Sequence, residues 1–113
     1  MEKYIDNKKQ CLKYFKFFAN KDLSGLKDMF SDEIVLKDWD VSGSGKLNVL
    51  QINENIFSSV KSITINPVNM YCDCCTVISE LEVVVDNNDR LSIVDVISFD
   101  KLGKIIKINA YKQ

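Results

Sequence analysis

The sequence predicts a single α+β domain, residues 1–113, in which three N-terminal helices pack on a curved antiparallel sheet. Residues 3–60 mostly carry apolar side chains at helical spacing, whereas residues 63–111 form runs of β-branched and apolar residues separated by short turns. The length of 113 residues suits one domain with one core, and no stretch rich in Gly, Ser and Pro marks a linker.

Three segments have the spacing of helices. Residues 3–19 contain no Gly or Pro, and their apolar positions are Cys11, Leu12, Phe15, Phe18 and Ala19. A short second helix is expected to follow an N-cap at Asp22 and to run through Phe30. Residues 46–60 are expected to form the third helix, after a polar, glycine-bearing loop at residues 40–45. Its apolar positions are Leu47, Leu50, Ile52, Ile56, Phe57 and Val60.

The remaining segments have the composition of strands. A short strand is expected at residues 34–39, between the second and third helices. Residues 63–72 contain Pro67, which cannot donate a ladder hydrogen bond and so marks an edge strand or a bulge. Three further strands are expected at residues 76–85, 91–99 and 105–111, joined by turns at residues 86–89 and 100–103.

Composition argues against several classes of function. The chain has 15 basic and 16 acidic residues, a net charge of −1, and Arg90 as its only arginine, which argues against nucleic-acid binding. It has no histidine, which excludes histidine-based catalytic triads and HExxH zinc sites. No run approaches the roughly 18–20 apolar residues of a membrane helix. The first ten residues lack the apolar core of a signal peptide, so we expect a cytoplasmic protein without membrane association.

Two aspartates follow the apolar side of predicted strands. Asp95 occupies the middle of the bulkier apolar face of residues 91–99, and Asp38 shares the apolar face of the first strand. Burying an unpaired charge costs free energy, so carboxylates that point to the same side as the hydrophobic side chains suggest a functional site. Two alternatives stay open. Asp38 can turn out to solvent or cap the next loop, and Asp95 is exposed if Val94 and Val96 form the core face.

Together, two such carboxylates can supply an acid and a base. A carboxyl group in an apolar pocket has a raised pKa and can donate a hydrogen bond, while a second one near the mouth stays ionised and accepts a proton. Tyr14 lies on the inner side of the first helix and is a candidate for a second hydrogen-bond donor. The alternative for Tyr14 is a half-buried core tyrosine.

Three segments carry a family resemblance that covers nearly the whole chain. Residues 18–26 and 29–34 look like a helix end, a D-x-x-x-L turn and an M-[FY]-[AS]-[DE]-[DE] strand start, and residues 95–111 look like a closing hairpin. In this order they resemble the NTF2-like superfamily, and within it the ketosteroid isomerase and SnoaL-like branch. The resemblance implies a cone-shaped pocket between a curved sheet and the helices, and a homodimer through the outer sheet face.

The resemblance also implies roles for residues. In the isomerase branch an aspartate that ends the first strand is the general base, and Asp38 stands at that motif position. A tyrosine eight residues before the aspartate of the turn donates to the developing oxyanion, which is the position of Tyr14 relative to Asp22. A protonated aspartate in a V-[IV]-D-V strand is the second donor, and Asp95 matches it. That family is the standard example of a neutral carboxyl donor.

Five apolar or aromatic residues are expected in the pocket wall on the same grounds. They are Phe18, Phe30, Trp39, Ile97 and Tyr111. The sequence departs from the isomerase pattern at three positions: Phe30 replaces a tyrosine, Trp39 follows the base where a small residue is common, and Lys112 stands where an aromatic residue would line the pocket. These departures predict a small apolar ligand rather than one of steroid size. We also expect no cofactor.

Cysteines are clustered at one place in the sequence. Cys72, Cys74 and Cys75 have C-x-C-C spacing, which differs from the paired C-x₂₋₄-C arrangement of zinc sites, and neighbouring strand residues point to opposite faces. We therefore expect no metal site, and reduced thiols that act as small hydrophobic residues at a strand bend.

Three functions remain open from the sequence. The first is an enzyme that moves a proton next to a carbonyl group on a small apolar substrate, by isomerisation or aldol-type cyclisation. The second is a module that binds an apolar ligand without chemistry. The third is a protein-interaction or assembly module that uses its outer sheet face.

Overall fold

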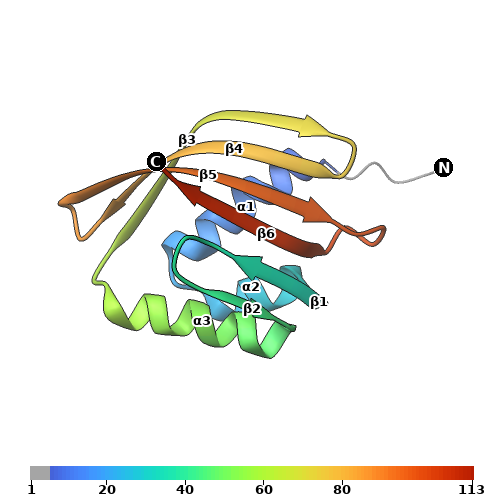
Figure 1. Cartoon of the computed structure of the whole chain (residues 1–113), viewed down its shortest axis with the longest axis horizontal. Helices are drawn as coiled ribbons and strands as arrows, with labels where there is room; N and C mark the ends of the chain where they lie inside the picture. Colours follow the sequence, from blue (N-terminus) through green and yellow to red (C-terminus); the bar gives the residue numbers. More distant parts are fainter. Residues whose placement is uncertain (1–5) are drawn as a thin grey trace.

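The computed structural model describes residues 6–113, which form three helices and a six-stranded sheet (Figure 1). The helices are α1 (Asn7–Ala19), α2 (Leu23–Met29) and α3 (Lys46–Ser59). The strands are β1 (Phe30–Lys37), β2 (Ser42–Ser44), β3 (Ile63–Asp73), β4 (Thr76–Val85), β5 (Asp89–Phe99) and β6 (Ile105–Lys112). The α+β prediction is confirmed, because the three helices pack against one side of the curved sheet; β1 and β2 lie between α2 and α3 in the chain.

Aspartate side chains begin the first two helices. The Asp6 carboxylate accepts a hydrogen bond from the backbone N–H of Lys9 at 3.2 Å, and the Asp22 carboxylate accepts one from Gly25 at 2.9 Å. Each bond satisfies a backbone donor that the first helical turn leaves free. The predicted cap at Asp22 is confirmed. Residues 3–5 of the predicted first helix lie outside the described residues, and α1 begins at Asn7.

The strands lie in the order β2-β1-β6-β5-β4-β3, and one pair differs from the prediction. Strands β3 to β6 are antiparallel neighbours, but β1 and β6 run parallel, so the sheet is mixed rather than antiparallel. Parallel neighbours need a long connection, and here residues 38–104, with α3 and four strands, separate the two. The chain thereby brings the end of β1 beside the end of β6, where the site is built.

The first strand and the loop after it also differ from the prediction. β1 begins at Phe30 rather than Ile34, and part of the expected loop forms β2, which pairs with the end of β1. A Cβ at Gly43 in β2 would lie 2.7 Å from Cδ1 of Ile52 on α3, so a larger residue there would require the isoleucine side chain to shift. The short strand and α3 therefore pack closely at this edge of the sheet.

Five of the six apolar positions predicted in the segment of α3, residues 46–60, are buried or partly buried against the core, and Leu47 is the exception. The fully buried positions of α3 are Val49, Asn53 and Phe57, whereas Leu47 is 79% exposed. These three positions are spaced by four residues, which places them on one stripe of the helix. The flanking apolar residues Leu50, Ile52, Ile56 and Val60 are partly buried against the core. An amide side chain thus lies in the middle of a buried stripe.

Pro67 marks both an edge and a bulge, as predicted. β3 is the outer strand of the sheet, and its pairing with β4 shifts register between Pro67 and Asn69. β4 has the predicted bounds, and the predicted turns after β4 and β5 are confirmed. No helix among residues 6–113 is both long and apolar enough to cross a membrane.

The clustered cysteines lie at the β3–β4 hairpin turn. Cys72, Cys74 and Cys75 are exposed, so the prediction of packed hydrophobic residues is wrong for them. Cys74 has a φ of +57°, because a two-residue hairpin turn requires a positive φ. Cys11 is buried in α1, and burial raises its thiol pKa to about 12. Within residues 6–113 no group of three His, Cys, Asp or Glu side chains is placed to hold a metal ion.

Candidate active site

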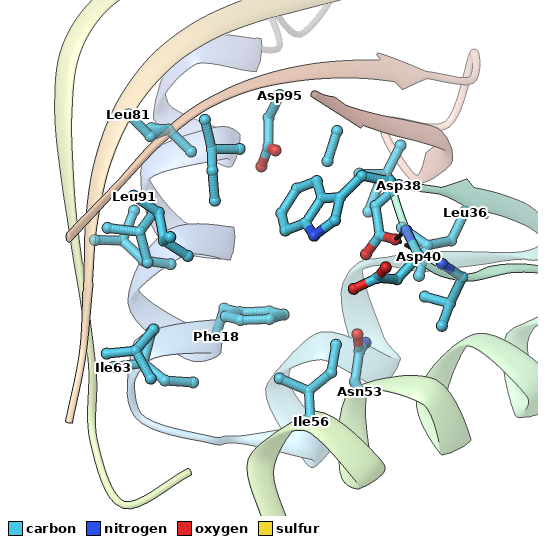
Figure 2. Close-up of a pocket in the computed structure, with 18 of the residues that line it drawn as sticks. Phe18, Leu36, Asp38, Asp40, Asn53, Ile56, Ile63, Leu81, Leu91 and Asp95 are labelled. Atoms are coloured by element: carbon cyan, nitrogen blue, oxygen red, sulfur yellow. Dashed lines mark hydrogen bonds between the residues drawn. The ribbon is translucent and has the colours of Figure 1, made fainter. Parts of the chain in front are cut away.

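A cavity of about 290 Å³ lies between the inner face of the sheet and helices α1 and α3 (Figure 2). Most of its wall is apolar and comes from β1, β3, β4, β5, β6 and the two helices. Five lining side chains are polar: Tyr14, Asp38, Asp40, Asn53 and Asp95. Among the described residues, no lysine or arginine lines it. The cavity is therefore an apolar chamber with a few convergent polar groups, which is typical of a small-molecule site.

Asp95 lies on the inner face of β5, as the alternation of apolar residues predicted. It is 8% exposed, and the residues paired with it are Ser79 on β4 and Ala110 on β6. No described residue is hydrogen-bonded to its carboxyl group. Burial, and secondarily the negative charge of Asp38, raise the pKa of Asp95 from 3.8 to about 7. Asp95 can therefore carry a proton near neutral pH and donate it in a hydrogen bond.

Tyr14 enters the cavity from the buried side of α1. Its ring is held by three phenylalanine rings, those of Phe15, Phe18 and Phe30, at centroid distances of 5.7, 6.0 and 6.3 Å. Burial, followed by the charge of Asp95, raises the pKa of Tyr14 well above 10.0. Tyr14 is therefore a neutral hydroxyl in a fixed orientation on the same cavity as Asp95.

Asp38 follows β1 and serves two purposes at once. Its Oδ1 accepts hydrogen bonds from the backbone amides of Asp40 and Val41, each at 2.7 Å, which closes the turn toward β2. The alternative in which Asp38 caps the next loop is thus confirmed. The same half-buried carboxylate also lines the cavity, and Figure 2 shows it beside Asp40 on one side of the chamber. Its second oxygen makes no hydrogen bond to a described residue.

Two of the five expected wall residues line the cavity. Phe18 extends from α1 and packs edge-on against Phe57 of α3, with ring centroids 4.9 Å apart. Trp39 lies directly after Asp38 and is 42% exposed. The ammonium group of Lys112 lies 5.4 Å from the centroid of the indole ring. The indole therefore forms part of the mouth of the cavity, held from one side by a lysine.

The other three expected wall residues lie elsewhere. Phe30 is buried behind Tyr14 and supports that ring without reaching the cavity. Ile97 is on the inner face of β5, two residues beyond Asp95, and is buried in the core. Alternate residues of β6 take the inner face of the sheet, namely Ile108, Ala110 and Lys112. Tyr111 lies between two of these in the sequence, so it points to the outer face and is 58% exposed.

Sequence reasoning missed two polar residues of the cavity. Asp40 lies in the turn that Asp38 caps, and Asn53 lies on the buried stripe of α3. A signal for Asn53 was present, because it stands four residues from Val49 and four from Phe57. No equivalent signal existed for Asp40, whose position depends on the pairing of β1 with β2.

The arrangement can stabilise negative charge at one place and accept a proton at another. Tyr14 and protonated Asp95 are two neutral donors in an apolar enclosure, where hydrogen bonds to a developing oxyanion are strong. Asp38 offers a carboxylate oxygen to the same cavity from the sheet end. The charge of Asp95 raises the pKa of Tyr14 and the charge of Asp38 raises the pKa of Asp95, which places these groups in one electrostatic neighbourhood.

No protein-family model and no curated protein sequence matches the chain. Solved structures, in contrast, match the chain. An NTF2-like protein of unknown function from Cytophaga hutchinsonii is 12% identical with a TM-score of 0.81, over 100% of this chain and 95% of that one. A proposed isomerase of the SnoaL-like family from Agrobacterium tumefaciens is 10% identical with a TM-score of 0.82, over 95% and 97%.

An LEH-like epoxide hydrolase from M. tuberculosis is 13% identical, with a TM-score of 0.83 over 95% of this chain and 82% of that one. Other similar structures include a proposed ketosteroid isomerase and proposed polyketide cyclases. At these identities the likeness concerns the backbone alone, and proteins with different chemistries share it. The order of helices and strands and the position of the cavity are those of the expected architecture: the chain has the NTF2-like fold.

Proposed function

We propose that the protein binds a small, largely apolar carbonyl compound and moves a proton next to its carbonyl group. The observation that carries this proposal is the meeting of Tyr14, Asp38 and Asp95 on one apolar cavity. A carbon acid next to a carbonyl is acidified by donors to the carbonyl oxygen and needs a carboxylate to accept the proton. The fold is shared with proposed isomerases and cyclases, which is compatible with this chemistry.

In the proposed reaction, the free oxygen of Asp38 takes a proton from the carbon beside the carbonyl group. The electron pair of the broken C–H bond forms the C–C double bond of an enolate, and the carbonyl electrons move onto oxygen. Tyr14 and protonated Asp95 donate hydrogen bonds to that oxygen. Asp38 then returns the proton to the same carbon or to another. Alternatively, the enolate carbon attacks a second carbonyl carbon within the substrate, the π electrons of that carbonyl group move onto its oxygen, and the resulting alkoxide takes the proton from Asp38.

The size of the cavity limits the substrate. Small-molecule pockets commonly measure about 300–1,000 Å³, so a volume of about 290 Å³ is at the small end of that range. The indole of Trp39 occupies the mouth, which limits the length of the ligand. We therefore propose a substrate of one or two rings rather than a steroid.

Tyr14→Phe is expected to weaken the binding of 2-naphthol, a neutral mimic of the enolate, by roughly 2–10-fold. The phenylalanine keeps the ring packing but removes the donor, and a hydrogen bond between neutral groups contributes about 0.5–1.5 kcal/mol. Isothermal titration calorimetry measures the affinity. Tyr71→Phe is the matched control, because the Tyr71 hydroxyl lies on the outer side of the molecule, 3.3 Å from the Glu80 carboxylate. Equal affinities for wild type and Tyr14→Phe would contradict the proposed oxyanion site.

One observation favours ligand binding without catalysis as a second candidate function. One oxygen of Asp38 is already engaged by two backbone amides, so the carboxylate has a structural task that explains its presence without chemistry. In that case Asp38 and Tyr14 orient a ligand that leaves unchanged. The proton-exchange measurement in the Discussion separates the two functions.

We also propose that the outer face of the sheet pairs with a second copy of the chain. The helices cover only the inner face, and exposed apolar side chains on the outer face include Tyr71, Ile78 and Tyr111. Ile78→Lys is expected to convert a dimer into a monomer in sedimentation velocity, because a charge would be buried at the interface. Leu102→Lys, at an exposed turn away from this face, is the control and should not change the mass. A monomeric wild type would contradict the proposal.

A further inference from the structure

Asn53 is buried in the cavity wall without a partner. It is 3% exposed and projects from the middle of α3, where Val49 and Phe57 occupy the same stripe. Its Nδ2 is shielded from solvent and makes no hydrogen bond to any described residue. A buried amide donor without a partner destabilises a fold, and an apolar residue of similar size would fill the position better. The position therefore calls for an acceptor that residues 6–113 do not supply.

The position of Asn53 in the cavity identifies where that acceptor would be. Figure 2 shows Asn53 and Asp95 entering the chamber from different sides, Asn53 from α3 and Asp95 from the sheet. The sheet side of the chamber is apolar and includes Leu81 and Leu91, which Figure 2 draws on the side opposite Asp38 and Asp40. A ligand whose carbonyl oxygen is held at Asp95 would therefore reach Asn53 with a remote part of its body.

The charged side chains that line the cavity indicate the chemical class of this remote group of the ligand. Asp38 and Asp40 lie on the side of the chamber near Asn53, and among the described residues no lysine or arginine lines it. A carboxylate or phosphate there would face these two acidic side chains without a cation to balance it. A neutral oxygen acceptor, such as a ketone, ester or amide carbonyl, satisfies the amide without that repulsion.

We propose that Asn53 is a specificity-determining residue, and that its amide donates a hydrogen bond to a second, neutral carbonyl group on the substrate, remote from the carbonyl held by Tyr14 and Asp95. This inference rests on the proposed function and narrows it, because the substrate class becomes a compact dicarbonyl compound with an apolar body. One carbonyl group of such a substrate takes part in the reaction, and the other orients the substrate in the cavity.

Two probes test the role of Asn53. The probes are 6-acetyl-2-naphthol and 6-isopropenyl-2-naphthol, which have the same shape and differ in a remote oxygen that is replaced by CH₂. Wild type is expected to bind the acetyl compound about 5–10-fold more tightly by calorimetry, the range of one net hydrogen bond in a buried site. In Asn53→Leu this preference is expected to disappear or reverse. The same preference in both proteins, or no preference in wild type, would overturn the inference.

A stability measurement separates recognition from a purely structural role. Without ligand, Asn53→Leu is expected to unfold at a higher temperature than wild type, because the substitution replaces an unsatisfied amide with an apolar side chain of similar volume. A lower unfolding temperature in both Asn53→Leu and Asn53→Met would show that the amide supports the fold itself and would overturn the inference. Gln51→Leu, on the exposed side of α3, controls for the change in helix composition.

The two proposals fail in different ways. If Tyr14→Phe leaves the affinity for 2-naphthol unchanged while the acetyl preference depends on Asn53, the oxyanion site is wrong and the Asn53 subsite stands as a feature of a binding protein. If Tyr14 matters and the acetyl preference is the same in Asn53→Leu, the proposed function stands and this inference fails.

Discussion

Asp38→Asn is expected to lower the rate of proton exchange next to a carbonyl group by about 10²–10⁴-fold, the contribution typical of a general base. The asparagine retains a carbonyl oxygen that can accept the two hydrogen bonds from the amides of Asp40 and Val41. The turn after β1 is therefore expected to persist, and the substitution removes only the proton acceptor. The rate is measured by NMR as the loss of the α-hydrogen signals of 2-tetralone in D₂O.

The comparison variant is Asp40→Asn, because Asp40 is the second carboxylate on the same side of the cavity. It is exposed and two residues away, and its removal is expected to leave the exchange rate near that of wild type. A large loss in Asp40→Asn and a wild-type rate in Asp38→Asn would transfer the role of base to Asp40. No exchange above the buffer rate in wild type, together with tight binding of 2-naphthol, would favour ligand binding without catalysis.

The free energy of unfolding is expected to fall by up to about 4 kcal/mol as the pH rises from below 3.8 to above 7, through Asp95 alone. The pKa of Asp95 is about 7 in the folded protein and near 3.8 in the unfolded chain. Between these values the unfolded chain has released the proton and the folded protein still holds it, so the folded state loses relative stability as the pH rises. The full difference is present below pH 3.8 and lost above about pH 7, at 1.36 kcal/mol per unit of pKa.

Asp95→Asn is expected to remove this pH dependence, since its amide carries no charge at any pH. Chemical denaturation at a series of pH values then gives a flatter profile for the variant, which is the more stable protein above pH 7. Asp89→Asn is the control, because Asp89 lies at the exposed start of the same strand. Parallel profiles for wild type and Asp95→Asn would show that the carboxyl group is not held in a low-dielectric site.

Alternation along one strand was enough to predict the buried carboxyl group. In β5 the buried positions are Ile93, Asp95, Ile97 and Phe99, as the bulkier apolar face indicated, and Val94 and Val96 lie on the outer face. The regularity holds because this part of β5 is central: β4 pairs with it up to Ser98, and β6 pairs with it from Ile93 to Phe99. A strand with neighbours on both sides keeps its register, so sequence parity and burial agree.

On the last strand the family resemblance gave the wrong residue, whereas the alternation of side chains gives the right one. The resemblance placed Tyr111 in the pocket wall, but the alternation from Ile108 through Ala110 assigns the inner face to Lys112 instead. An aromatic residue is typical of a pocket wall, but the alternation of side chains along a pleated strand determines which face of the sheet Tyr111 occupies. The structure resolves the conflict in favour of the pleat, and the ammonium group of Lys112 stacks over Trp39.

Other features depended on contacts that no local pattern contains. The parallel pairing of β1 with β6 joins segments separated by more than sixty residues, and β2 forms only because the end of β1 offers it a partner. The buried stripe of α3 depends on which side of the helix the sheet meets, so Leu47 was assigned to the core and Asn53 was not considered. Tertiary packing, rather than local propensity, decided each of these features.

The indole at the mouth of the cavity gives the molecule an optical reporter of its own. Trp39 is the single tryptophan of the chain, and its ring is partly in solvent and partly against the cavity. A ligand that enters the cavity changes the polarity around this one fluorophore. Its emission wavelength and quenching can therefore follow occupancy without a label, and a library of transparent carbonyl compounds can be screened on unmodified protein.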